Sequence, residues 1–159
     1  MKLLIFLSLA LTMIFFCCCS HQVKKTSADT TGEKKVTSNP FFGEWNTPFG
    51  VPPFKSIENE HYLPAFEKAI EKHKAEIAAI VENSNEPTFE NTIVALDSSG
   101  ISLARVAKVF FGQLNANTND ELDRIAKKVS PMLTKHEDNI LLDEELFARI
   151  TAVHEKAAE

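Results

Sequence analysis

The sequence predicts an all-α fold: a lobe of about four helices that follows an extended segment rich in proline and aromatic residues. Apolar residues after about residue 59 recur at spacings of three and four, which is the period of an amphipathic helix. No stretch of useful length alternates apolar and polar residues as a strand would. We expect three segments: a signal peptide at 1–19, a flexible tether at 20–38 and the helical lobe at 39–159.

Residues 1–19 have the features of a targeting segment. Lys2 supplies a positive charge, and the apolar run Leu3–Phe16 is shorter than the roughly 20 residues that cross a bilayer. Cys17, Cys18 and Cys19 follow at once, which predicts a bacterial lipoprotein whose mature chain begins at a diacylated cysteine. Cys19 is our choice for the lipid anchor because two small residues precede it, and Cys18 is the alternative. An ordinary cleavable signal is the other interpretation.

Residues 20–38 are mostly serine, threonine, lysine and glycine, with valines only at Val23 and Val36. Such a segment buries too little apolar surface to offset the entropy lost on ordering. It would let a domain anchored through Cys19 stand away from the membrane. We therefore expect a location in the bacterial cell envelope, on its periplasmic or outer-membrane face.

Charge excludes one class of partner. The 121 residues from 39 to 159 carry 12 basic and 20 acidic side chains, a net charge of −8. Nucleic-acid binding draws its affinity from a basic face. We therefore expect no nucleic-acid partner.

The segment before the helices is extended because its prolines fix φ and remove backbone donors. Those prolines are Pro40, Pro48, Pro52 and Pro53. The same segment is too apolar for a solvated linker, so it is predicted to lie against a larger body. Its apolar residues are Phe41, Phe42, Trp45, Phe49, Val51, Phe54 and Ile57.

The first helix is predicted from about Asn59 to Asn83, with Pro64 in its first turn, where a missing amide costs little. The second, from about Thr88 to Ala116, is apolar on most sides and should lie between neighbours. With Thr88 as its N-cap, it is predicted to run about 40 Å. A bend is expected at residues 98–100, Ser-Ser-Gly.

A third helix is predicted to open with a capping box from Thr118 to Glu121. Pro131 should kink it, because proline removes the bond to the carbonyl of Lys127. A fourth helix should start near Asp143 and continue to the end of the sequence. Its acidic first turn favours this position.

Five stretches of the chain carry a family resemblance. The first, Pro52–Ile70, reads P-P-F-x-x-I-x-x-E-H-x-x-P-A-F-x-x-A-I. It is joined by Pro87–Ile93, Arg105–Phe111, Asp120–Leu122 and Leu146–Ile150. Together they resemble the amino-terminal region of the zinc metallopeptidases that include thimet oligopeptidase, oligopeptidase A and peptidyl-dipeptidase (dipeptidyl carboxypeptidase).

The resemblance implies an enzyme that uses zinc to hydrolyse short peptides. It also implies that this lobe walls one side of a substrate channel, with the catalytic region further toward the carboxyl terminus. That catalysis rests on H-E-x-x-H, where two histidines bind zinc and the glutamate polarises water. Here His136-Glu137 leads to Ile140, and His154-Glu155 leads to Ala158.

We therefore assign no catalytic, cofactor-binding or metal-binding residue, and we expect this chain alone to be inactive. An open zinc site needs three protein ligands. His61 is expected to help start the first helix and His73 to lie at the edge of its apolar face. His136 is expected near the end of the third helix, where a cation is favourable. His21 falls in the tether.

Two functions remain open at this point. The first is the amino-terminal part of a lipid-anchored metallopeptidase. The alternative is a complete lipid-anchored helical module that binds a peptide or a protein. We favour the first because Lys156–Glu159 holds no Gly or Pro that would end the last helix. A coding sequence that continues to an H-E-x-x-H would decide between them.

Overall fold

The computed structural model describes residues 38–158, and the part of the chain that it describes contains helices and no strand. The all-α class is therefore confirmed. The expected signal peptide, the Cys19 anchor and the tether as far as residue 37 lie outside the described residues. The longest helices are α2 (Tyr62–Val81), α4 (Ile101–Ala116), α5 (Asp120–Leu141) and α6 (Glu144–Ala157).

Helix α2 begins and ends close to the predicted bounds. A single 3-10 turn, Asn59–His61, leads into it, and Pro64 lies in its first turn. Glu58 and His61 form a reciprocal capping pair, in which the Glu58 amide donates to His61 Nδ1 at 3.0 Å. This pair satisfies two backbone donors that the start of a helix leaves free.

The second predicted helix is wrong as a single continuous element. The structure divides it into a π-helical segment (Phe89–Val94), α3 (Ala95–Asp97) and α4, with Thr88 as the N-cap as predicted. The expected bend is a break, because Gly100 adopts the left-handed conformation with φ 70°. A Cβ at this position would lie 2.7 Å from the ring of His73, so only glycine fits without a shift.

The predicted capping box of the third helix is also wrong. The side chain of Asn119, rather than that of Thr118, accepts hydrogen bonds from the amides of Glu121 and Leu122, both at 3.0 Å. The Thr118 hydroxyl instead bonds to Asp123 Oδ1 at 3.0 Å. Both residue types are good caps, and the extended backbone of Asn119 places its oxygen over the first turn.

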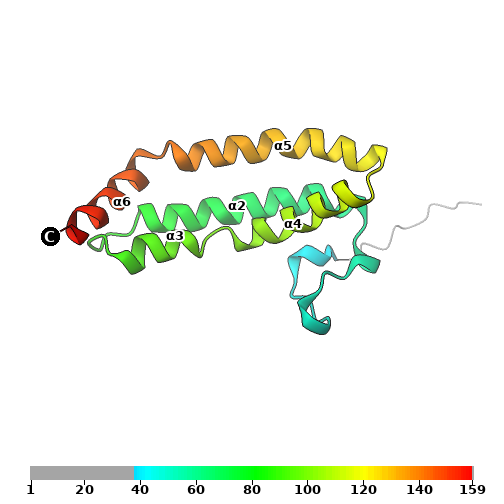
Figure 1. Ribbon diagram of the computed structural model, residues 1–159, viewed down its shortest axis with the longest axis horizontal. Coiled ribbons are helices and arrows are strands. Elements are labelled where there is room, and N and C mark those ends of the chain that lie inside the picture. Colours follow the sequence, from blue (N-terminus) through cyan, green and yellow to red (C-terminus); the bar gives the residue numbers. More distant parts are fainter. Residues whose placement is uncertain (1–37, 159) are drawn as a thin grey trace, which may run out of the picture. The chain divides into compact units, whose positions relative to one another are not determined.

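Helix α5 continues through Pro131 as one element, and α6 starts where predicted. At the start of α6, Asp143 accepts a hydrogen bond from the Leu146 amide at 2.8 Å. Helix α2 contacts α4, α5 and α6 (Figure 1). Figure 1 shows α5 along one side of α2 and the α3–α4 pair along the other.

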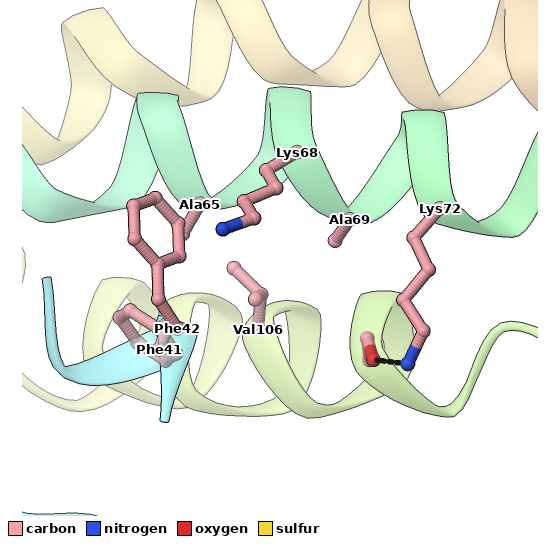
Figure 2. Close-up of a pocket in the computed structure, with 8 residues that line it drawn as sticks. Phe41, Phe42, Ala65, Lys68, Ala69, Lys72 and Val106 are labelled. Carbon is pink, nitrogen blue, oxygen red and sulfur yellow. Dashed lines mark hydrogen bonds between the residues drawn. The ribbon is translucent and has the colours of Figure 1, made fainter. Parts of the chain in front are cut away.

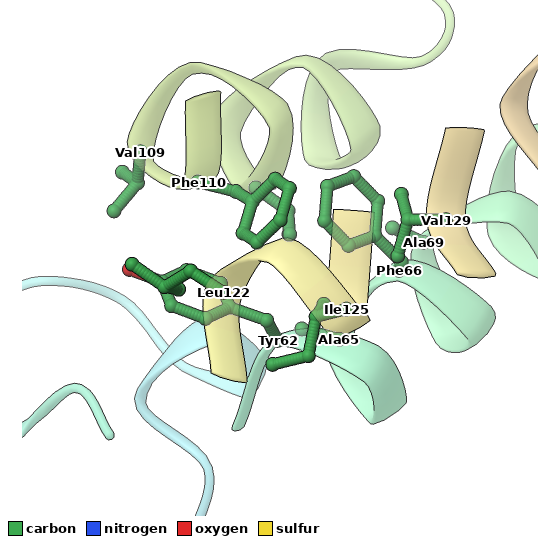
Figure 3. Close-up of a cluster of buried hydrophobic side chains, with 10 residues drawn as sticks. Tyr62, Ala65, Phe66, Ala69, Val109, Phe110, Leu122, Ile125 and Val129 are labelled. Carbon is green, nitrogen blue, oxygen red and sulfur yellow. The ribbon is translucent and has the colours of Figure 1, made fainter. Parts of the chain in front are cut away.

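The main core lies where α2, α4 and α5 meet (Figure 3). Phe66 and Phe110 are fully buried, and their rings meet edge to face with centroids 5.4 Å apart. Tyr62 also packs edge-on against Phe110, at 5.0 Å. A smaller cluster joins the far end of α2 to α6 through Ile77, Ile80 and Leu146.

The proline-rich segment packs against this core at its two ends, through Phe41 and Trp45 in the first part and Ile57 at the last. Phe41 and Trp45 rest on the main cluster, and the Trp45 indole donates to the carbonyl of Pro40 at 3.0 Å. The Arg105 guanidinium lies 3.5 Å above the Trp45 ring, in cation–π geometry. The middle of the segment is exposed: Phe49 is fully accessible and has a positive φ of 61°. The predicted packing is therefore correct for part of the segment.

Candidate functional site

The histidines are the first candidates for metal ligands or catalytic residues, and His61 and His154 lie in different parts of the fold. His61 helps start α2, as predicted, and His154 is exposed on α6. Across residues 38–158 no three His, Cys, Asp or Glu side chains are placed where they could together bind a metal ion. The described residues therefore do not form a binding site for the zinc ion that the family resemblance implies.

His73 and His136 are brought together, which the sequence did not predict. His73 comes from α2 and His136 from α5, and His73 Nδ1 lies 3.0 Å from His136 Nε2. The rings meet edge to face with centroids 4.8 Å apart. His136 lies near the end of α5, as expected, but it does not favour a positive charge there, since its side chain is only 4% exposed and burial lowers its pKa.

The pair continues into the break between α3 and α4. His73 Nε2 lies 3.0 Å from Ser99 Oγ, and Ser99 Oγ donates to the carbonyl of Leu96 at 2.7 Å. The Gly100 amide donates to Glu76 Oε2 at 2.8 Å. Two side chains of α2 therefore fix the break and connect it to α5.

Burial acts on both rings in the same direction. It lowers the pKa of His73, although the nearby Glu76 carboxylate opposes the effect. It also lowers the pKa of His136, and the interactions with His73 and with the Lys74 cation lower it further. Burial therefore favours the neutral form of both rings.

Two cavities adjoin the pair. One, of about 340 Å³, is lined by His73, Leu103, Leu133, His136, Glu137, Ile140 and Leu141. The other, of about 380 Å³, is lined by His136 with Lys74, Ile77, Ala78, Val81, Glu82, Asn139, Ile140, Asp143 and Glu145. His136 is common to both.

A third cavity lies under the proline-rich segment (Figure 2). Lys72 Nζ donates to Ser102 Oγ at 2.9 Å at one end of it, and Lys68 Nζ lies 4.1 Å from the centroid of the Phe42 ring. Its volume is about 140 Å³. Ligand pockets usually measure roughly 300–1,000 Å³, so this cavity is too small for a peptide.

Two of the sequence motifs that carry the resemblance meet at a corner of the fold. Arg149 Nη1 donates to the carbonyl of Asn83 at 2.7 Å, and Nη2 lies 3.3 Å from Asn91 Oδ1. Asn91 also caps the π-helical segment, because its Oδ1 accepts from the Thr88 amide at 2.8 Å. Lys156 adds an ion pair to Glu86 at 2.6 Å. The motif residues at this corner hold the fold together.

No family model matches the chain. Over 121 residues it is 45% identical to the dipeptidyl carboxypeptidase of Escherichia coli (strain K12), a match that covers 76% of this chain and 18% of that protein. The chain is homologous to the amino-terminal region of dipeptidyl carboxypeptidase. The protein of the same name from Salmonella typhimurium (strain LT2) is 40% identical over 118 residues, covering 74% of this chain and 17% of that protein.

The chain thus spans less than a fifth of the length of these relatives. The predicted resemblance is confirmed for dipeptidyl carboxypeptidase. Within residues 38–158, no helix has the length and apolar character needed to cross a membrane.

Proposed function

We propose that this chain is the amino-terminal part of a zinc-dependent peptidase of the dipeptidyl carboxypeptidase type, which hydrolyses short peptides. In this proposal the described helices wall one side of the substrate channel. The observation that carries the proposal is the 45% identity over 121 residues, which is 76% of this chain.

Exposed apolar side chains support a larger assembly. The proline-rich segment exposes Phe49, Val51 and Phe54, and the junction of α5 and α6 exposes Leu141, Leu142 and Phe147, of which Leu142 is 78% exposed. Groups of exposed large apolar side chains commonly mark an interaction site. A peptidase body that packs against these residues would remove them from water.

The chemistry is assigned to a region beyond this chain. The described residues provide no set of zinc ligands, and a catalytic zinc site uses three protein ligands and one open position. We therefore place the zinc and its H-E-x-x-H motif in a carboxy-terminal region. This chain by itself is expected to be inactive.

The anchor is a further part of the proposal. The apolar run Leu3–Phe16 and the cysteines at 17–19 favour a lipoprotein held in the cell envelope through Cys19. Labelling with a radioactive fatty acid tests this, with the Cys19→Ala and Cys18→Ala variants side by side. Loss of label in Cys19→Ala alone supports Cys19. Loss in Cys18→Ala alone would transfer the anchor to that residue.

A lipid-anchored module that binds a peptide or protein remains the second candidate. It is favoured by the closed core, in which Phe66 and Phe110 are fully buried without any further chain. In this case the apolar residues at the α5–α6 junction would contact the partner directly.

The deciding experiment measures hydrolysis of a short fluorogenic peptide, with and without a chelator. The 159-residue chain and the product of its whole locus are assayed in parallel. Activity in the whole product alone, abolished by chelator and restored by zinc, supports the peptidase. A locus that stops at Glu159 and yields no hydrolysis with added zinc would refute it and leave the binding module.

A further inference from the structure

The directions of the hydrogen bonds determine where the protons lie on the two histidines. The carbonyl of Leu96 can only accept, so Ser99 uses its single hydroxyl proton there. Ser99 Oγ must then accept from His73, which places the proton of neutral His73 on Nε2. His73 Nδ1 is left as an acceptor, and His136 Nε2–H donates to it.

In this assignment His136 Nδ1 carries no proton, so it can only accept a hydrogen bond. It is buried and has no hydrogen-bond partner among the described residues. An unpartnered buried acceptor is a costly arrangement in a folded protein, and it is the only ring nitrogen of the pair that is not engaged.

The neutral pair carries two ring protons. A third proton can bind at only one atom if the hydrogen bond between His136 Nε2 and His73 Nδ1, called the bridge below, is to be kept. Protonation of His73 Nδ1 would set two N–H groups against each other at 3.0 Å, unless the His136 Nε2 proton moved away. In either tautomeric form that keeps the bridge, the added proton therefore ends on His136 Nδ1. There it is a buried donor without an acceptor, on a pair that now carries a positive charge.

The surrounding charges act in opposite senses on the two rings. From α2, Glu76 favours a charge on His73 and Lys74 disfavours one on His136. From α5, Glu137 lines the smaller cavity, and the side of α4 that faces this cavity contributes Leu103, which is uncharged. The larger cavity adds the carboxylates of Glu82, Asp143 and Glu145.

We propose that the His73–His136 pair is a pH-sensitive latch that holds the second half of α5 against α2 only while both rings are neutral. Protonation separates the rings and widens the cavity that both of them line.

The sign of the effect follows from linkage. The ordinary histidine pKa is 6.5, and the fold lowers the pKa of both rings. The unfolded chain therefore binds more protons than the folded chain as the pH falls below about 6.5. The stability that the pair contributes is complete above this pH and is lost progressively below it.

Thermal unfolding of the full chain at about pH 7.5 and about pH 5.5 tests the latch. His136→Gln is the informative variant, because its amide nitrogen can still donate to His73 Nδ1 but does not titrate. His154→Gln, at an exposed position on α6, is the matched control. We expect the fall in Tm on acidification to be smaller in His136→Gln by roughly 2–4 °C. His154→Gln should keep the whole fall.

Equal falls in the wild-type chain and in His136→Gln would overturn the proposal. Should that variant not fold, the wild-type chain decides, through long-range ¹⁵N–¹H NMR spectra of the imidazoles. The latch requires protons on Nε2 of both rings at neutral pH and two titrations displaced below the ordinary histidine pKa of 6.5. A proton on His136 Nδ1, or titrations at the ordinary value, would refute it.

Discussion

Arg149 Nη2 lies 3.3 Å from Asn91 Oδ1, which joins α6 to the start of the π-helical segment 58 residues earlier. The same guanidinium donates to the carbonyl of Asn83, just beyond the end of α2. One side chain thus holds three parts of the chain together, and each acceptor would lose a strong donor without it.

Arg149→Ala should therefore destabilise the fold by about 1–3 kcal/mol, because it leaves partly buried carbonyl and amide oxygens without their charged donor. The measurement is urea unfolding followed by circular dichroism. Arg124→Ala is the control, since Arg124 forms an exposed i,i+3 pair with Glu121 on α5. It should change the stability by less than about 1 kcal/mol. Equal effects of the two variants would show that the corner does not depend on Arg149.

The glycines offer a second matched pair. Gly100→Ala should destabilise by more than about 1 kcal/mol, because the new Cβ would meet the His73 ring in a left-handed backbone conformation. Gly112→Ala, inside α4 and with nothing within 4 Å of its Cβ, should stabilise by up to about 1 kcal/mol. Differential scanning calorimetry of the two variants checks the opposite signs. A neutral Gly100→Ala would contradict the assigned break.

The cap of α5 can be tested in the same manner. Asn119→Ala should cost about 0.5–2 kcal/mol, because two amides lose their acceptor. Thr118→Ala removes a single exposed hydrogen bond to Asp123 and should cost less. Chemical denaturation of both variants gives the order. The reverse order would restore Thr118 as the cap that the sequence predicted.

The main core depends on Phe110, which contacts Tyr62, Phe66 and Phe111. Phe110→Ala should cost about 3–5 kcal/mol, through lost burial and the cavity left behind. Phe49→Ala, at a fully exposed ring, should change stability by no more than about 0.5 kcal/mol. The comparison uses the midpoint of urea unfolding for each variant. A large loss in Phe49→Ala would mean that this ring is covered in solution.

The sequence predicted the helices well because their apolar residues repeat with the helical period. Phe66, Ile77 and Ile80 lie within the first predicted helix at the spacing of one helical face, and all three are buried. Acidic first turns and prolines likewise set the starts of α2 and α6 near their observed positions.

What the sequence did not reveal depends on contacts across space. His73 and His136 are 63 residues apart, and no local pattern shows that their rings meet. The helix is interrupted at Gly100, rather than only bent, because the His73 ring lies beside Gly100 and the Gly100 amide donates to Glu76. Both of these residues are on another helix. A glycine at the end of one apolar stretch and the start of another was the available signal. It indicated a bend, while the neighbouring side chains decided that the helix ends.

Helix α2 is the shared neighbour of α4, α5 and α6. These three helices follow α2 at increasing distances along the sequence, so each closes a loop of different length when it packs against α2. The contact between α6 and the carbonyl of Asn83 closes a loop of 66 residues, and it is supported by a few polar bonds and by an apolar cluster smaller than the main core. We expect this corner to form last during folding and to open first in the native state. Amide hydrogen exchange should accordingly be faster in α6 than in the middle of α2. The order in which the chain assembles is thus set by one central helix, and its latest step is the docking of α6.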